Sequence, residues 1–308
     1  MKKNAARYLS LVLKGMGMGA ADVVPGVSGG TIAFITGIYE ELINSIKGIN
    51  LKAIKLFFTG RWISFWKQIN GNFLLAVFAG IAISVLSLAK VLEYLLENKP
   101  ILIWSFFFGL VLASSYVVSR KITRWQYPKV IALVAGIGIA FYITSVTPTT
   151  TTDASWFVIL SGGLASCAMI LPGISGSFIL LLLGKYSFAL HAVNERIILD
   201  LLLLGVGAVT GLILFANLLS WLLKKYHDIT IAVLVGFMIG SLNKIWPWKE
   251  TVKSIIVEGE LRPLVEKNIL PSIGNPGDQF WMAMLMLAAG IALILFVEIG
   301  LTRNKKSS

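Results

Sequence analysis

Long apolar segments separated by short polar ones dominate the pattern of this chain. Four stretches carry no charged side chain, at residues 74–89, 101–119, 130–152 and 280–297. Each approaches or exceeds the roughly 20 residues that a helix needs to cross a bilayer. The pattern predicts six spans, at about 73–96, 101–119, 129–146, 198–223, 229–245 and 279–301. We therefore expect an all-α polytopic membrane protein.

Two further apolar regions are each interrupted by a Pro-Gly turn. The apolar pieces are 8–24 and 31–46 in the first region, and 156–171 and 178–192 in the second. Proline cannot continue a helix and glycine weakens one, so each turn should end the helix before it. We interpret residues 8–46 and 156–192 as re-entrant helical hairpins, which enter the membrane and return to the same side.

The two turns belong to an internal repeat. The sequence PGVSGGTI at residues 25–32 recurs as PGISGSFI at residues 172–179, an offset of 147 residues. The same offset pairs Gly37 with Gly184, and a weaker echo links the segments that begin at Gly109 and Gly236. Such symmetry is typical of transporters. We expect two repeats, over residues 1–150 and 151–308, each with one hairpin and three spans.

The distribution of basic residues predicts the orientation. The loops expected on one side contain Lys2, Lys3 and Arg7, residues 47–67, Arg120, Lys121, Arg124 and Lys129, Lys224 and Lys225, and Arg303, Lys305 and Lys306. The positive-inside rule makes this side cytoplasmic, together with both termini. Because three spans are an odd number, the second repeat should be inverted relative to the first. Residues 51–69, where Trp62 lies among basic residues, should form an interfacial helix.

Composition excludes several classes of protein. The chain is 56% hydrophobic and 14% charged, with a mean hydropathy of +0.82, which a soluble domain of 308 residues would not have. The net charge of +12 does not indicate a nucleic-acid partner, because the basic residues lie between apolar segments. One cysteine and two histidines exclude thiolate metal clusters, and no phosphate loop is present, so we expect no metal and no cofactor.

The two helix breaks form the candidate binding site. Non-helical backbone inside a membrane is tolerated where it is buried or lines a cavity, and paired breaks indicate a site near the midplane. A helix should begin after Ser28 and another after Ser175, with first amides that lack partners and could bind an anion. The candidate binding residues are Lys14, Asp22, Gly26, Ser28, Gly29, Gly30, Thr31, Gly173, Ser175, Gly176 and Ser177. Close helix packing is the alternative role of such glycines and serines.

Few ionisable residues accompany the hairpins. Lys14 could neutralise a phosphate, and Asp22 could orient that lysine or carry a proton. Moving phosphate inward against a negative interior costs about 2.3 kcal/mol per charge per 100 mV, which favours coupling to protons. Asp22, Glu40 and His191 are the candidates for that coupling, although Glu40 also fits a solvated helix end and His191 an interfacial residue. We expect Lys185 to extend its ammonium toward water.

Three segments resemble one family of bacterial membrane proteins. KGMGMGAADVVPGVSGGTIA at residues 14–33, followed by GIYE at 37–40, resembles the signature of the polyprenyl-phosphate transporter family, formerly a domain of unknown function. LPGISGSF at 171–178 resembles its second signature, and residues 236–248 are also similar. The resemblance implies a protein of the bacterial cytoplasmic membrane that returns undecaprenyl phosphate, the lipid carrier of cell-wall sugars, from the outer to the inner leaflet.

The Pro-Gly turns also allow three alternative functions. Undecaprenyl-pyrophosphate phosphatases use a similar turn, Pro-Gly-x-Ser-Arg-Ser-Gly, but here Gly29 or Gly176 takes the position of the arginine. Phosphoryl transfer needs a strong cation at the transferred group, so we expect no enzymatic activity. A permease for a small soluble anion and a structural scaffold are the remaining alternatives.

Overall fold

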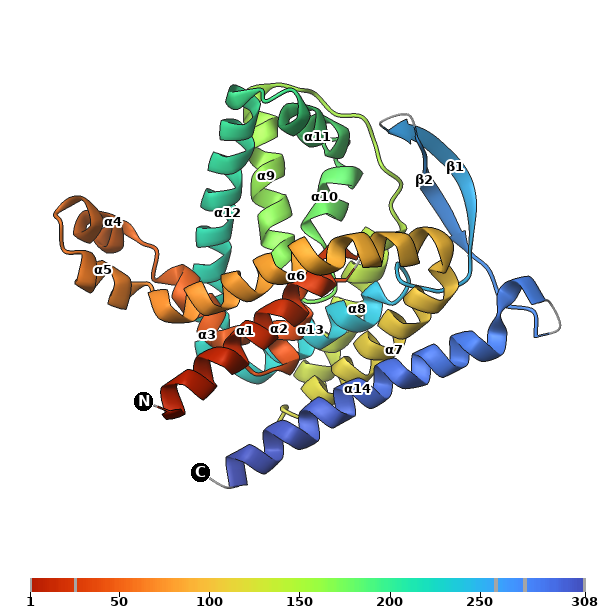
Figure 1. Cartoon of the computed structure of the whole chain (residues 1–308), viewed down its shortest axis with the longest axis horizontal. Coiled ribbons are helices and arrows are strands. Elements are labelled where there is room, and N and C mark those ends of the chain that lie inside the picture. The colour runs from red at the N-terminus through yellow and green to blue at the C-terminus, as the bar shows by residue number, and fades with distance from the viewer. Residues whose placement is uncertain (1, 25–26, 258–259, 274–275, 307–308) are drawn as a thin grey trace.

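The protein is built almost entirely from helices (Figure 1). The computed structural model describes residues 2–24, 27–257, 260–273 and 276–306, so Pro25 and Gly26 of the first turn lie outside the described residues. The elements are α1 (Lys2–Val23), α2 (Gly29–Ile35), α3 (Tyr39–Lys47), α4 (Leu51–Phe58), α5 (Trp62–Gln68), α6 (Gly71–Asn98), α7 (Pro100–Ser119), α8 (Tyr127–Ser145), α9 (Ser155–Ile170), α10 (Gly176–Leu182), α11 (Tyr186–Asn194), α12 (Ile198–Lys225), α13 (His227–Ser241), β1 (Lys249–Val257), β2 (Glu260–Asn268), η1 (Pro276–Asp278) and α14 (Phe280–Lys306).

The long apolar helices identify a multi-pass membrane protein, as expected. Within the described residues, α6, α7, α8, α12 and α14 are each long and apolar enough to cross a bilayer. The predicted span at 229–245 corresponds to α13, whose 15 residues extend about 22 Å. Many large apolar side chains remain exposed on these helices, such as Leu86, Phe296 and Leu202, because lipid rather than water is their solvent.

The helices associate in four extensive pairs: α1 with α6, α9 with α12, α7 with α14, and α8 with α13. Figure 1 shows α9 and α12 side by side. Glycines permit the close approach, because a Cβ added to Gly15 would overlap the carbonyl of Val77, and one added to Gly80 would overlap that of Val12. The corresponding contacts between α9 and α12 are Gly162 with Leu204 and Gly207 with Ile159. The contact of Gly162 with Leu204 repeats that of Gly15 with Val77. The hairpin residue is 147 positions further along the chain (162 − 15), and the span residue is 127 positions further (204 − 77).

The other two pairs are related in the same way. In the pair of α7 and α14, Gly109 approaches Leu287 and Gly290 approaches Phe106; in the pair of α13 and α8, Gly236 approaches Leu133 and Gly136 approaches Val233. The helix pairing is therefore unchanged when the two halves of the chain are exchanged.

Each predicted hairpin contains one more break than the sequence analysis expected. The pieces 31–46 and 178–192 are not single helices, because α2 ends before α3 and α10 ends before α11. Gly37 and Gly184 occupy these second turns with φ of +73° and +65°, a conformation that glycine adopts without strain. The bend between α10 and α11 is 109°, and Figure 1 shows α10 returning beside α9.

Two polar segments also differ from their predictions. Residues 51–69 form two short helices, α4 and α5, instead of one, with a turn at Gly60, where φ is +72°. The long segment after α13 contains an antiparallel hairpin of β1 and β2, so the fold is not purely α-helical as we expected. Threonine, valine and isoleucine concentrate between residues 251 and 257, a composition that favours strands and that could have revealed β1.

Candidate functional site

The two helix breaks contact each other directly, although 147 residues separate them in sequence. The Ser28 hydroxyl donates to the carbonyl of Met169 at 3.1 Å, and the amide of Gly173 donates to the Thr31 hydroxyl at 3.0 Å. The hydroxyl of Tyr39 donates to the carbonyl of Ile170, also at 3.1 Å. Met169 and Ile170 end α9, where carbonyls lose their helical partners, so the first hairpin caps the helix that leads into the second break.

At the first break, the amides that we expected to be free are already occupied. The Gly29 amide donates to Oδ1 of Asp22 at 2.6 Å, and the Gly30 amide donates to the Ser28 hydroxyl at 3.1 Å. The carboxylate lies so close to Gly29 that an added Cβ would overlap it. The expectation of bare amides is therefore wrong here, because Asp22, near the end of α1, reaches across the turn to the start of α2.

The second break offers a different environment. The Ser175 and Ser177 hydroxyls lie 2.7 Å apart, and no side chain caps the start of α10. Within the described ranges, the amides of Gly176 and Ser177 have no hydrogen-bond acceptor. The side chain of Met169 lies against Gly176, as that of Asp22 lies against Gly29. Ser177 is exposed whereas Ser175 is buried, so this break is open on one side.

Lys14 lies at the far end of α2 from the break. Its ammonium donates to the carbonyl of Thr36 at 2.8 Å, and that of Lys121 donates to the carbonyl of Phe34 at 3.2 Å. The seven residues of α2 separate this end from Ser28 by about 10 Å. The structure therefore does not bring Lys14 together with the serines. Helix α2 runs back along α1. Asp22 therefore contacts the N-terminal end of α2, the positive end of its helix dipole, and Lys14 contacts the C-terminal, negative end.

The other proton-coupling candidates are also dispersed. Glu40 lies at the start of α3, with Oε1 3.4 Å from Nε2 of His227, and both side chains are exposed. His191 is exposed in the last turn of α11. No hydrogen bond or ion pair of the described residues connects either of them to Asp22. Of the three candidates, only Asp22 lies at a Pro-Gly break.

Lys185 contradicts the expectation that its ammonium extends to water. Its side chain is 1% exposed and donates to Asp153 Oδ1 at 2.5 Å and to the carbonyl of Thr151 at 3.2 Å. The rings of Phe157 and Phe188 each lie 5.6 Å from the ammonium. Sequence reasoning missed this burial, because the partners of Lys185 come from the loop before α9, more than 30 residues away.

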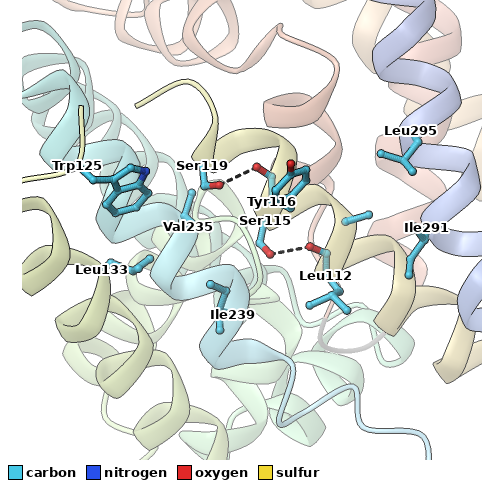
Figure 2. Close-up of a pocket in the computed structure, with 11 residues that line it drawn as sticks. Leu112, Ser115, Tyr116, Ser119, Trp125, Leu133, Val235, Ile239, Ile291 and Leu295 are labelled. Atoms are coloured by element: carbon cyan, nitrogen blue, oxygen red, sulfur yellow. Dashed lines mark hydrogen bonds between the residues drawn. The ribbon is translucent and has the colours of Figure 1, made fainter. Parts of the chain in front are cut away.

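A large apolar cavity lies beyond the breaks, between α7, α8, α13 and α14. Its volume is about 480 Å³, and Figure 2 shows Trp125, Leu133 and Leu295 on its walls. The hydroxyls of Ser115 and Ser119 line it but donate at 2.7 Å to carbonyls of their own helix, those of Leu112 and Tyr116. Among its described lining residues none is charged, so the cavity suits a hydrocarbon chain and not a phosphate.

Comparison with known proteins places the chain in a family. The family model described as undecaprenyl phosphate translocase-like matches residues 18–261. A polyprenyl-phosphate transporter of Vibrio cholerae serotype O1 is 45% identical over 303 residues, 97% of this chain and 98% of the relative. One of Staphylococcus aureus is 35% identical over 256 residues, 77% of this chain and 85% of the relative. No solved structure is significantly similar. The matched segment includes both helix breaks, and the chain belongs to the undecaprenyl phosphate translocase-like family.

Proposed function

We propose that this protein moves undecaprenyl phosphate across the bacterial cytoplasmic membrane, returning the lipid carrier from the outer to the inner leaflet for cell-wall polymer synthesis. Family membership and the multi-pass architecture support this function. The observation that carries it is the contact between the two breaks, where Ser28 bonds Met169 and Thr31 bonds Gly173. Broken helices that meet inside an apolar bundle are the arrangement in which transporters bind polar groups.

The symmetric helix pairing supports two inverted repeats. When each helix of residues 1–150 is matched with its counterpart in residues 151–308, the pair of α1 and α6 corresponds to the pair of α9 and α12. In the same way, the pair of α7 and α14 corresponds to the pair of α13 and α8. With cytoplasmic termini, the first hairpin would enter from the cytoplasm and the second from outside. The two breaks then meet from opposite sides, which provides alternating access when one repeat rocks against the other.

The phosphate would first bind at the second break, where the amides of Gly176 and Ser177 and the two hydroxyls are available. At the first break it must displace the Asp22 carboxylate from Gly29 before Gly29 and Gly30 can bind it. A proton on Asp22 would reduce the repulsion between carboxylate and phosphate, so Asp22 is the proposed coupling residue. Lys14 acts indirectly, by holding the far end of α2.

The prenyl chain would remain in apolar surroundings throughout. The cavity between α7, α8, α13 and α14 is lined mainly by apolar side chains and could hold part of that chain during translocation (Figure 2). Each prenyl carbon kept from water contributes to retention in the apolar phase, about 25 cal/mol per Å² of apolar surface. Only the headgroup then needs a polar path.

An enzymatic role is less well supported. Gly29 and Gly176 stand where the related phosphatase turn has arginine, and a cation at that position would be needed for phosphoryl transfer. In the part of the chain that the structure describes, no group of three His, Cys, Asp or Glu residues could hold a metal ion. We propose transport without hydrolysis.

Vesicles that contain the purified protein and a leaflet-specific probe for undecaprenyl phosphate test the function. We expect wild-type protein to accelerate movement between leaflets, without release of inorganic phosphate, and Ser28→Ala and Ser175→Ala to slow it. Ser87→Ala is the matched control, because this exposed hydroxyl bonds only the carbonyl of Ile83 in its own helix. Wild-type vesicles that move the lipid no faster than protein-free ones would refute the proposal.

A further inference from the structure

A second cavity, of about 250 Å³, lies between the base of the β1–β2 hairpin, the turn after α13, helix α10, and the end of α8 with the loop that follows it. Its charged lining residues are Lys244, Lys249, Glu266 and Lys267. The strand register brings Lys249 and Glu266 together, because Lys249 pairs with Asn268 and Thr251 with Glu266 at the open end of the hairpin; Lys244 approaches from the turn after α13. Sites for drug-sized ligands measure roughly 300–1,000 Å³, so this cavity suits a small headgroup and not a whole lipid.

The charges in this cavity do not balance. The ammonium groups of Lys244 and Lys249 both lie 3.3 Å from the same atom, Oε2 of Glu266. One carboxylate therefore serves two lysines. Lys267 also lines the cavity, but its cross-strand partner is Glu250. Lys244, Lys249 and Glu266 together carry a net charge of +1, which a phosphate monoester that has lost one proton would balance.

The positive charge of Lys249 is buried and only partly compensated by its surroundings. Its side chain is 8% exposed, and its ammonium lies 4.3 Å from the centre of the Trp104 ring. Burial lowers the pKa of Lys249 to about 8, which Glu266 opposes only in part. Burial alone would raise the pKa of Glu266, but the charges of Lys249 and Lys244 outweigh it and hold that pKa below its ordinary value. The cluster thus keeps its carboxylate ionised and has room for another anion.

The cavity also adjoins the second break. Phe178, which directly follows Ser177 in α10, lines it, and the Lys244 ammonium lies 5.2 Å from the centre of that ring. Asn243 and Asn268 lie on the same wall, where the Asn268 side-chain amide donates to both carbonyl oxygens of Asn243 at 2.9 Å. A headgroup bound by the lysines would therefore lie beside the start of α10, whose first amides have no acceptor among the described residues.

We propose that the cavity lined by Lys244, Lys249 and Lys267 is a loading subsite, which binds a phosphate monoester before the second break receives it. The subsite rests on the proposed function and on the proposed orientation: with a cytoplasmic C-terminus after α14, the β1–β2 hairpin before α14 faces outward. Phosphate monoester is the chemistry that it recognises, and both a prenyl phosphate headgroup and free inorganic phosphate present similar oxygens. The lysines would exchange Glu266 for phosphate oxygens and release the headgroup toward α10.

Binding to the purified full-length protein in detergent, by calorimetry, tests the subsite with two probes: farnesyl phosphate and inorganic phosphate. We expect Lys244→Gln and Lys249→Gln each to weaken farnesyl phosphate binding by about tenfold or more, as loss of a charge-assisted hydrogen bond does. Glu266→Gln should strengthen it several-fold, because the competing carboxylate is removed. If inorganic phosphate binds more weakly than farnesyl phosphate, the ligand is a lipid headgroup. If the two bind equally well, the ligand is free phosphate.

Two further variants keep the test decisive if the buried lysines are needed for folding. Lys267→Gln alters an exposed side chain and should weaken binding by about threefold, through the loss of one nearby charge. Lys224→Gln removes the same charge from the exposed end of α12 and should bind like wild type. Unchanged affinity in Lys244→Gln, Lys249→Gln and Lys267→Gln would overturn the subsite.

Transport assays of the same variants separate this inference from the proposed function. If wild-type protein moves the lipid and the lysine variants bind and transport equally well, the subsite is wrong and the function stands. If wild-type protein moves no lipid but the lysine variants lose phosphate binding, the proposed function is wrong and the anion site stands.

Discussion

The two Pro-Gly breaks have closely similar sequences but present different groups to a ligand. In the first, the Asp22 carboxylate accepts the Gly29 amide at 2.6 Å. In the second, the equivalent position 147 residues later is Met169, and the start of α10 has no side-chain cap. A repeated turn determines the path of the backbone, whereas the residue one turn earlier determines whether the break repels or accepts an anion.

The opposite ends of the two short helices differ in the same way. After α2, the carbonyl of Thr36 accepts from the Lys14 ammonium; after α10, the equivalent carbonyl of Leu183 accepts from the Thr151 hydroxyl at 2.5 Å. The first short helix therefore has a charge at each end and the second has neutral groups. Charged side chains already compensate both ends of the α2 dipole in the absence of a ligand. The start of α10 is therefore the better place for initial binding.

Moving the carboxylate to the other break should have the largest effect. Met169→Asp places an acidic side chain against Gly176, where it can occupy the amides of α10 as Asp22 occupies that of Gly29. We expect undecaprenyl phosphate translocation in vesicles to fall by about a hundredfold, which corresponds to roughly 2.8 kcal/mol. Met169→Gln, uncharged and of similar length, should retain most activity. Equal rates for the two variants would contradict the distinction between the breaks.

Removing the charge from the first break should have the next largest effect. Asp22→Asn retains an acceptor for the Gly29 amide but neither repels phosphate nor exchanges a proton. We expect translocation to slow by about tenfold, within the range that one proton-transfer group contributes, while farnesyl phosphate binding does not weaken. Binding that weakens in parallel with transport would show that Asp22 has a structural role only.

A smaller effect, on stability, should follow from separating the two breaks. Thr31→Val removes the acceptor of the Gly173 amide and leaves that buried donor unpaired, which costs about 1–3 kcal/mol. Thermal unfolding in a single detergent measures the change. Thr36→Val is the control, since its hydroxyl bonds the carbonyl of Ile32 within the same hairpin. Comparable shifts in both would show that the contact between the breaks is unimportant.

The smallest effect is expected at the far end of α2. Lys14→Gln removes a cation from the C-terminal end of a helix, a change of about 0.3–1 kcal/mol in stability. Farnesyl phosphate binding should remain within about twofold of wild type, because Lys14 does not lie at the break. A tenfold loss of binding would return Lys14 to the headgroup site.

The sequence by itself determined the features that depend on local chemistry. Hydrophobic length identified five of the six predicted spans, proline and glycine located both breaks, and the offset of 147 residues revealed a repeat in the sequence. These predictions succeed because bilayer thickness and backbone sterics act on each segment independently of its partners.

Only the tertiary structure decided which side chains meet. Lys14 lies at the wrong end of α2 for the predicted site, Asp22 covers an amide expected to be free, and Lys185 is buried. Lys249 meets Glu266 because β1 and β2 pair, and Lys244 reaches the same carboxylate from the turn after α13. Hydrogen bonds and ion pairs depend on ångström-scale approach between segments distant in sequence, and residue spacing along one chain does not specify that approach.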